Sequence, residues 1–339
     1  MMKKRLFILL FLLLSLLPSL GMLLLGPSPL LANESATKTP HLNAELFRDL
    51  TDYMGARFAL RPYLVSARSF LYEKLFHSSA EEQVVLGRDG ELFYSSTIAD
   101  YCGQGLTDED LQRVADNLLE IQRNIENRGG QFLFVVAPNK NSLKSELMPA
   151  RFPENQSDSN YVRLLPLLEE LGVHTVDLHT MLSGRAELYY TTDSHWTAEG
   201  AAIAADALLQ ALGRKSSFAS GPFTGDGWHA GDLYQMLYPT GKGREAELSY
   251  APGFRHTTAS DPRGGNAITI RTQCETGTGT LYCRRDSFGI ALYPYLAEAF
   301  ASAEFSRSDD YSSAAFDMVS ADVVILEIVE RNIDTLLGK

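Results

Sequence analysis

Apolar residues recur at helical spacing in several stretches of the chain. The most regular stretch predicts a helix that begins after Thr107, which has capping-box spacing to Asp110, and ends before Gly129. Five apolar residues share one face of this helix: Leu111, Val114, Leu118, Ile121 and Ile125. Further helices are expected in residues 45–76, as a pair forming an N-terminal cover, and in residues 161–172, 197–212 and 290–300.

Apolar runs alternate with these helices and predict strands within QFLFVVAPNKN, VHTVDLH, GTLYCRRDSFG and DVVILEIVERNIDTLL. Because strands that alternate with helices form crossover units, we expect a mostly parallel sheet in a single decorated α/β domain. Residues 84–94, VVLGRDGELFY, have the pattern of a β-hairpin. Residues 213–265 are rich in Gly, Ser, Thr and Tyr and predict an insertion or lid over the sheet edge.

The N-terminal stretch differs from the rest in its polarity. Lys3, Lys4 and Arg5 precede 20 residues without a charge, which is the length of a membrane span. The sequence favours an uncleaved signal-anchor helix over residues 1–26, with a cleaved signal peptide and secretion as the alternative. Residues 27–45 then form a linker, and residues 46–339 form the domain, which the positive-inside rule places outside the cytoplasm.

Charge and composition narrow the classes of ligand. The formal net charge of the 339 residues is −12, and the N-terminal stretch contributes three positive charges, which disfavours nucleic acid and anionic lipid as partners. A neutral sugar is compatible with this charge. The chain has neither a Gly-x-Gly-x-x-Gly nor a Walker motif, and its seven histidines lack metal-ligand spacing, so no cofactor and no metal are expected.

The three cysteines leave two alternatives open. In an oxidising compartment Cys274 and Cys283 could form a disulfide across a hairpin at the Gly-Thr-Gly of CETGTGTLYC, which would leave Cys102 unpaired. The other interpretation is three unpaired, buried thiols.

Candidate catalytic residues lie in loops expected beyond the carboxyl ends of the strands, where open parallel sheets bind ligands. Ser287 follows a strand and precedes a helix, so its hydroxyl should point out of the sheet, near backbone N–H groups suited to an oxyanion. His195 could act as its base and Asp193 could orient the imidazole. The alternative is structural: Asp286 or Ser287 caps one helix, and Asp193 or Thr197 caps the other.

Other residues compete for a functional role. Asp177 and His179 form a second pair with the same spacing, which ranks below the first because no helix cap is expected nearby. Lys140, in the Pro138-Asn139-Lys140 loop, could bind an anion or could simply be solvated. Arg331, at the carboxyl end of the last strand, could face the catalytic site.

Five segments in this order resemble one known family. They are VVLGRDGELFY, FVVAPNKNSLKSELMP, TTDSHWTAEGA, HAGDLYQML and RRDSFGIALYPYLAEAF with DVVILEIVER after it. Together they resemble the SGNH hydrolase-like alginate O-acetylation proteins AlgJ and AlgX and the bacterial DHHW proteins, over about residues 45–335. The family usually has Trp at the position of Glu91, and the cysteines around CETGTGTLYC are unusual for it.

The resemblance implies a three-layer, flavodoxin-like SGNH fold that is circularly permuted, with Ser287, His195 and Asp193 as its triad. It implies O-acetylation of an exported polysaccharide through an acetyl-serine, with acetyl groups supplied by a membrane-bound O-acyltransferase (MBOAT). Backbone amides near Ser287 and Gly289 would hold the oxyanion, with Asn139, Lys140 and Arg331 as further substrate contacts. A carbohydrate acetylesterase and a non-catalytic glycan-binding or assembly protein are the alternatives.

Overall fold

A seven-stranded mixed sheet forms the centre of the protein in the computed structural model, which describes residues 2–31, 34, 38–42, 44–243, 245–259, 268–308 and 310–337. In spatial order its strands are β4 (Thr175–Val176), β3 (Gln131–Ala137), β11 (Val323–Val329), β9 (Thr280–Arg285), β10 (Ser302–Arg307), β8 (Thr269–Gln273) and β7 (Thr257–Thr258). The first five strands are parallel, and β8 and β7 add an antiparallel edge. The prediction of a mostly parallel sheet is confirmed.

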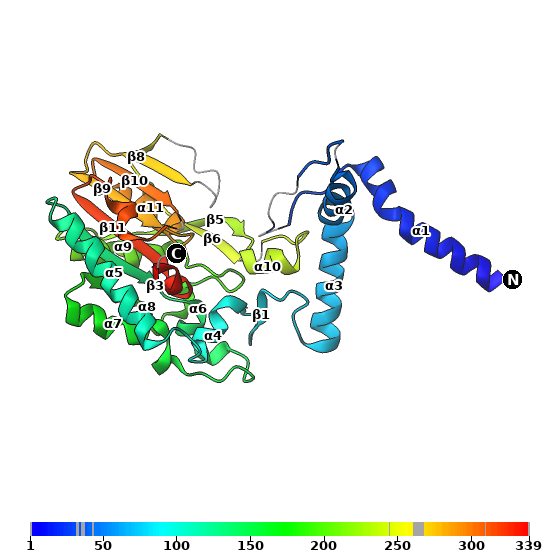
Figure 1. The fold of residues 1–339 in the computed structure, drawn as a ribbon, viewed down its shortest axis with the longest axis horizontal. Coiled ribbons are helices and arrows are strands. Elements are labelled where there is room, and N and C mark those ends of the chain that lie inside the picture. Colours follow the sequence, from blue (N-terminus) through cyan, green and yellow to red (C-terminus); the bar gives the residue numbers. More distant parts are fainter. Residues whose placement is uncertain are drawn as a thin grey trace.

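Helices cover both faces of this sheet and give three layers (Figure 1). One face packs against α5 (Asp108–Glu126), α7 (Asn160–Leu171) and the 3-10 helix η8 (Glu330–Leu337). The other packs against α8 (Leu178–Leu182), α9 (Ala198–Ala211) and α11 (Gly289–Ala297). Strand β11 shows why both faces are apolar: Val324 and Leu326 face the first set of helices, whereas Val323 and Ile325 face the second.

Smaller elements surround the sheet. The predicted hairpin is present as β1 (Val84–Leu86) and β2 (Leu92–Tyr94), which pair antiparallel. A separate ribbon of β5 (Phe223–His229) and β6 (Glu245–Tyr250), with α10 (Asp232–Leu237) between its strands, occupies the stretch predicted as an insertion. The remaining short helices are α4 (Ile98–Tyr101) and α6 (Lys140–Leu143).

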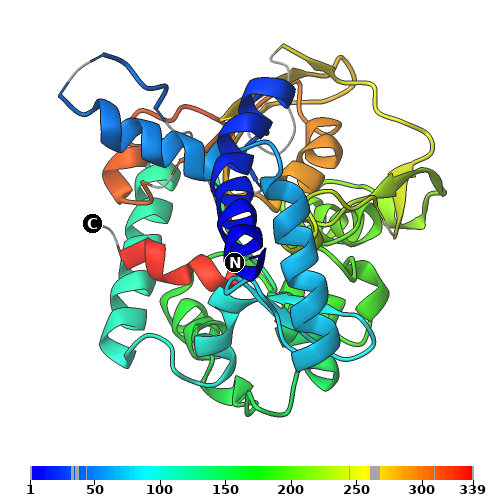
Figure 2. The ribbon, with the colours of Figure 1, turned by 90° about the vertical axis from the view of Figure 1, so that its right-hand side faces the viewer.

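The N-terminal helices stand to one side of the α/β body (Figure 1), and Figure 2 views the protein from that side. They are α1 (Met2–Leu25), α2 (Leu46–Arg57) and α3 (Arg61–Phe76). The pair predicted in residues 45–76 is therefore present, and α3 reaches the body near α10, where Glu73 accepts a hydrogen bond from the hydroxyl of Tyr238. Among the described residues, no helix combines the length and apolar character needed to cross a membrane.

The predicted disulfide is wrong. Cys274 and Cys283 are free thiols, and both are buried. Cys274 follows β8 and Cys283 lies in β9, but β10 is inserted between these strands. Two strand spacings of about 4.8 Å separate β8 from β9, which is more than a disulfide spans between these backbones. CETGTGTLYC therefore connects non-neighbouring strands and is not a hairpin.

Two other predictions need adjustment. The strand expected in VHTVDLH is reduced to Thr175–Val176, because Asp177 ends it by capping α8 through a hydrogen bond from the Thr180 amide. The edge strands β8 and β7 and the parallel strand β10 were not predicted. The Asp-x-His turn precedes the β9 strand in the chain, but the circular permutation itself stays a prediction.

Candidate active site

Ser287 lies in the tight turn between β9 and α11, at the carboxyl end of the sheet. The turn is held by the buried carboxylate of Asp286, which accepts from the Phe288 amide at 2.8 Å and from the Val329 amide of β11 at 2.7 Å. Helix α11 begins without a side-chain cap. Asp286 thus binds a free amide just before α11, as its capping alternative proposed, whereas Ser287 caps nothing and its hydroxyl is available for another partner.

That partner is His195. The Ser287 Oγ lies 2.8 Å from His195 Nε2, and His195 Nδ1 lies 2.7 Å from Asp193 Oδ1. Since an ionised carboxylate only accepts hydrogen bonds, Nδ1 of the imidazole donates to Asp193, and Nε2 of the neutral ring accepts from Ser287. The helix cap of α9 is Thr197, whose Oγ1 accepts from the Gly200 amide at 3.3 Å, so Asp193 and His195 are not needed for capping.

The second oxygen of Asp193 binds the β5–α10–β6 ribbon. Asp193 Oδ2 accepts from His229 Nε2 at 2.8 Å and from the Asp232 amide at 2.9 Å. Burial acts to raise the pKa of the Asp193 carboxyl, but hydrogen bonds from His195 and His229 outweigh it and hold the pKa well below its usual range. Asp193 is thus ionised and placed between two imidazoles.

The ribbon approaches the Asp-x-His turn very closely at Gly231. A Cβ at that position would lie 2.1 Å from the carbonyl oxygen of Thr192, so only glycine fits. On the same side, the Asp232 carboxylate accepts from the Ser194 amide at 2.8 Å and from the Ser194 hydroxyl at 2.6 Å. The pKa of Asp232 is raised, first by burial and then by the charge of Asp193.

Lys140 is buried beneath this turn, which corrects the solvated lysine considered above. Its Nζ donates to the carbonyl oxygens of Tyr190, Thr191 and Asp193 at 3.1, 3.0 and 2.7 Å. The buried carboxylate of Glu91 lies 3.1 Å from this Nζ and 3.0 Å from Nζ of Lys144. Burial lowers the pKa of Lys140 to about 8, although Glu91 acts to raise it. Glu91, where the family usually has Trp, therefore supplies the counter-charge for two buried lysines.

A cavity of about 530 Å³ opens in front of Ser287 and His195. Aromatic and aliphatic side chains make up most of its wall, including Trp196, Tyr250 and Phe254. Trp196 also links the two site loops, because its Nε1 donates to the Phe288 carbonyl oxygen at 3.2 Å. The nucleophile candidate and its base therefore share one apolar chamber of a size that small-molecule and sugar sites have.

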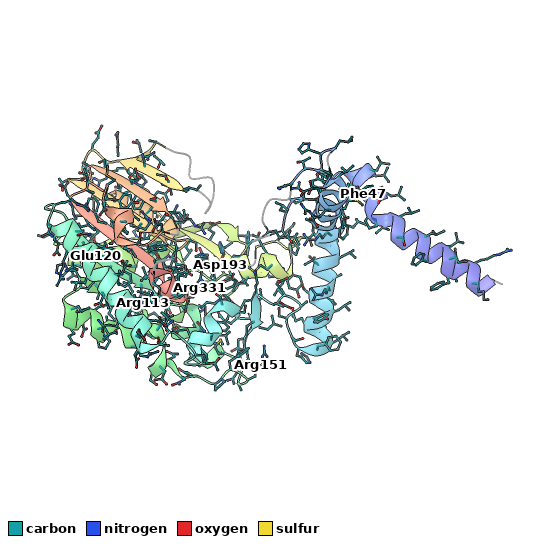
Figure 3. The ribbon with its side chains drawn as sticks, viewed as in Figure 1. Phe47, Arg113, Glu120, Arg151, Asp193 and Arg331 are labelled. Carbon is teal, nitrogen blue, oxygen red and sulfur yellow. The ribbon has the colours of Figure 1, made fainter. Side chains whose placement is uncertain are left out.

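The four other predicted site residues do not line this cavity. A Cβ on Gly289 would lie 2.7 Å from Arg285 and 2.9 Å from Glu327 Oε2, so its glycine is needed for packing. The Asn139 amide donates to Glu330 Oε2 at 2.8 Å, and its side chain is buried. Arg331 stacks over the rings of Tyr94 and Phe288, and Figure 3 labels Arg331 and Asp193 among the side chains of the α/β body. Lys140, as described above, supports the turn from below.

The rival pair has a structural role. Asp177 Oδ1 accepts from the Tyr161 hydroxyl at 2.8 Å, and the His179 ring stacks on Tyr161 with centroids 5.9 Å apart. Burial lowers the pKa of His179. Asp177 therefore caps α8 and fixes α7, and neither residue lines the cavity at Ser287.

One group of described residues has ligand atoms close enough for a metal ion: Asp193, His195 and Asp232, within 4.8 Å of one another. Hydrogen bonds already engage these atoms. Asp193 accepts from both histidines, and Asp232 accepts from Ser194. A cation would have to displace the proton between His195 and Asp193, so the donor set fits a proton-transfer site better than a metal site.

Sequence reasoning did not assign roles to His229, Asp232, Glu91 or Lys144. A signal for two of them was present, because His229 and Asp232 both lie in the segment HAGDLYQML. Their contacts with Asp193 and Ser194 are made across more than 35 residues of chain and depend on the folding of the ribbon. No spacing rule in the sequence connects the two segments.

Comparisons with known proteins agree with this architecture. A family model described as "SGNH hydrolase-like domain, acetyltransferase AlgX" matches residues 84–256, which include Asp193, His195 and His229 but end before Ser287. The "probable alginate O-acetylase AlgJ" of Pseudomonas putida is 25% identical over 185 residues, which are 53% of this chain and 47% of the relative. A second AlgJ, from Pseudomonas syringae, covers similar shares at 26% identity. The chain thus spans about half the length of these curated relatives.

Two solved structures share the fold. PatB1 of Bacillus cereus, recorded with a sulfonyl adduct, is 16% identical and has a TM-score of 0.55, over 76% of this chain and 98% of that one. A DHHW family protein from Eubacterium siraeum is 15% identical with a TM-score of 0.52, over 76% and 95% of the two chains. Because the family model matches half of the sequence, the resemblance noted above is confirmed: this chain belongs to the SGNH hydrolase-like AlgX acetyltransferase family.

Proposed function

We propose that this protein is an O-acetyltransferase that acts on an exported or cell-surface polysaccharide. The observation that carries the proposal is the continuous hydrogen-bonded path from Ser287 through His195 to Asp193, which opens onto the cavity. These are the contacts that an activated serine needs. The names of the AlgX family and of the AlgJ relatives support acetyl transfer as the reaction.

In the first half-reaction His195 Nε2 takes the proton of the Ser287 hydroxyl while Oγ attacks the carbonyl carbon of an acetyl ester. We assign the tetrahedral oxyanion to the backbone amide of Ser287, next to Oγ, because Gly289, the other donor expected from the sequence, does not line the cavity. The carbonyl re-forms, the ester bond to the donor breaks, and His195 returns the proton to the departing alkoxide. Asp193 stabilises the imidazolium throughout.

In the second half-reaction a sugar hydroxyl gives its proton to His195 and attacks the acetyl-serine. Collapse of the tetrahedral intermediate expels Ser287 Oγ, which regains the proton from His195, and the acetyl group is now on the sugar. Water in place of the sugar would release acetate, which is the esterase alternative. The apolar wall formed by residues such as Trp196 and Phe254 supports transfer, because it limits the water near Ser287.

We also propose that the domain works outside the cytoplasm. The three basic residues followed by 20 uncharged ones in residues 1–26 support export, with the segment retained as an anchor or cleaved. A membrane-bound O-acyltransferase as the acetyl supplier is the partner that the family resemblance implies. Cell fractionation with a protease that cannot enter intact cells tests the location: a cytoplasmic, protected domain contradicts it.

The assay for the activity uses p-nitrophenyl acetate as the donor and oligosaccharides as acceptors. We expect mass spectrometry to show acetylated oligosaccharide, formed at the expense of free acetate as the acceptor concentration rises. Free acetate that does not decrease at saturating acceptor would favour the esterase. If neither acetylated oligosaccharide nor free acetate is formed but the protein binds the glycan, a non-catalytic assembly protein is favoured.

His229→Phe tests whether the second histidine positions Asp193. Phe keeps the stacking on Tyr190, whose ring centroid lies 3.8 Å from that of His229, but it removes the donor to Asp193. We expect kcat/KM for the ester to fall about tenfold or more, since a hydrogen bond to a charged group contributes about 1.5–3 kcal/mol.

A stability measurement separates this role from simple packing. Burial acts to lower the pKa of His229, but the hydrogen bond to Asp193 prevails and the pKa is raised. Its contribution to the free energy of unfolding is therefore complete below the unfolded pKa of about 6.5 and is lost as pH rises through the folded value. The difference in the free energy of unfolding between wild type and His229→Phe should therefore shrink as pH rises through the folded pKa of His229. His229→Gln should restore part of the activity that His229→Phe loses. An unchanged kcat/KM in His229→Phe contradicts the role.

A further inference from the structure

The cavity at Ser287 adjoins a second hollow of about 380 Å³. Tyr190 and Leu248 line both hollows, and we call the two together the acceptor groove. It follows the outside of the β5–β6 ribbon past the nucleophile. A groove of this kind has room for more than an acetyl group and suits an extended chain.

The charged side chains of the acceptor groove are almost all acidic. Its described lining residues contain five carboxylates: Glu187, Asp193, Glu199, Glu245 and Glu247. Lys144 is the one lysine among the described lining residues, and they include no arginine. Lys144 is only 4% exposed and lies 3.0 Å from Glu91, so its charge is already matched inside the protein.

Four of these carboxylates act electrostatically on one lining residue, Tyr190. The pKa of Tyr190 is raised to about 12, first by burial and then by the charges of Glu247, Asp193, Glu245 and Glu199. Asp193 is partly compensated by the imidazole of His229. Glu245 accepts from neutral donors, the Thr192 amide at 2.8 Å among them, and none of these donors is a cation. Glu247 is exposed, so the groove presents net negative charge to a ligand beside Ser287.

Aromatic side chains supply the other half of the recognition. Tyr190, Trp196, Tyr250 and Phe254 line the cavity next to the carboxylates. The apolar faces of sugar rings pack on such side chains, and carboxylates accept hydrogen bonds from sugar hydroxyls. A uronic acid would instead bring its own carboxylate next to Glu247, where the described lining residues offer no arginine and no lysine other than the already matched Lys144. Like charges in such a position disfavour binding.

From the acidic, aromatic acceptor groove we propose that the polysaccharide acceptor is uncharged, and that this enzyme discriminates against uronic-acid polymers such as the alginate of its named relatives. The inference rests on the proposed acetyl transfer to a polysaccharide and specifies its substrate class. The main determinant is Glu247, the exposed carboxylate that lines the cavity at Ser287, and Glu199 and Glu245 add negative charge in the adjoining hollow.

The test compares a neutral hexose oligosaccharide with an oligouronate of the same length as acceptors, with p-nitrophenyl acetate as the donor. At low salt we expect kcat/KM for the neutral acceptor to be at least about tenfold higher, in the range that electrostatic steering produces. The difference in kcat/KM between the two acceptors should become smaller as salt rises, because salt shortens the Debye length from about 30 Å at 0.01 M to about 8 Å at 0.15 M. An oligouronate that is acetylated as well as the neutral acceptor overturns the proposal.

Charge variants locate the effect. Glu247→Lys should improve the use of the oligouronate about tenfold relative to the neutral acceptor, and Glu247→Gln should lie between it and wild type. Glu275→Gln is the matched control, since Glu275 is an exposed carboxylate outside the groove, after β8. The quantity compared is kcat/KM for the oligouronate divided by kcat/KM for the neutral acceptor. If this ratio is equal in Glu247→Lys and Glu275→Gln, the discrimination does not arise in the acceptor groove.

A binding measurement keeps this inference separate from the proposed reaction. Donor hydrolysis without any acceptor reports on Ser287, so its absence contradicts the acetyl transfer. Calorimetry with Ser287→Ala then tests the acceptor by itself: the neutral oligosaccharide should bind at least about tenfold more tightly than the oligouronate. Tighter binding of an oligouronate, or of an amine-bearing oligosaccharide, overturns the choice of an uncharged glycan whatever the enzyme activity is.

Discussion

Ser287→Ala should lose both acetyl transfer and ester hydrolysis, with kcat reduced roughly 10⁴-fold or more. The reason is geometric: its Oγ lies 2.8 Å from His195 Nε2, and the turn that carries it is held by hydrogen bonds of Asp286 rather than by the serine. The free energy of unfolding should therefore change little. Initial rates with p-nitrophenyl acetate measure the fall in kcat, and thermal unfolding of the same preparation measures the change in stability.

A chemical probe complements this variant. A sulfonyl fluoride should label wild-type protein at one site, identified as Ser287 by peptide mass spectrometry, and should not label Ser287→Ala. Ser183→Ala, which removes an exposed hydroxyl after α8, is the matched control and should keep full activity. Undiminished transfer or hydrolysis in Ser287→Ala would remove the serine mechanism.

Lys140→Met should destabilise the protein on the order of 3 kcal/mol and also lower its activity. Methionine fills a similar volume, but it leaves the carbonyl oxygens of Tyr190, Thr191 and Asp193 without their buried donor. The Asp-x-His turn then loses its support, so the loss should appear mainly in kcat rather than in KM. Urea unfolding and ester kinetics measure the two effects. Lys215→Met, the same change at an exposed lysine, should alter neither.

The pH dependence of stability gives a signature specific to Lys140. Its folded pKa of about 8 is below the unfolded value of about 10.4, so between these values the unfolded chain binds one more proton. The free energy of unfolding therefore gains up to about 1.4 kcal/mol per pH unit from this group as pH rises through the window. Lys140→Met should lack that gain relative to wild type. A pH-independent difference between the two proteins, with KM alone affected, would favour substrate binding by Lys140.

Local signals were sufficient for much of the fold. Helix α5 carries its own cap at Thr107 and its own apolar face, and β3 is a continuous apolar run, so both could be predicted without tertiary information. Strands β8 and β10 could not. Each has polar or exposed residues among its buried ones, as at Arg271 and Glu304, because they lie toward the antiparallel edge of the sheet, and their pairing partners are far away in the chain.

The same distinction applies to the site. Asp193, His195 and Ser287 lie in short segments that resemble the family, and the structure brings these three side chains together. Lys140 could not be assigned correctly, because its burial depends on Glu91, which reaches it from the β1–β2 hairpin nearly 50 residues earlier. The disulfide prediction failed for a related reason, since nothing within CETGTGTLYC shows that β10 separates its two ends.

The ribbon that binds Asp193 has a consequence for how the site opens and closes. His229 of β5 and Glu245 of β6 hold the Asp-x-His turn, and they belong to a two-stranded element outside the main sheet, a kind of element that is only marginally stable by itself. Local detachment of this ribbon would release Asp193 while the seven-stranded sheet stayed folded. The fraction of molecules with an assembled site therefore depends on the free energy of docking the ribbon onto the α/β body. The ribbon is a cooperative unit smaller than the domain.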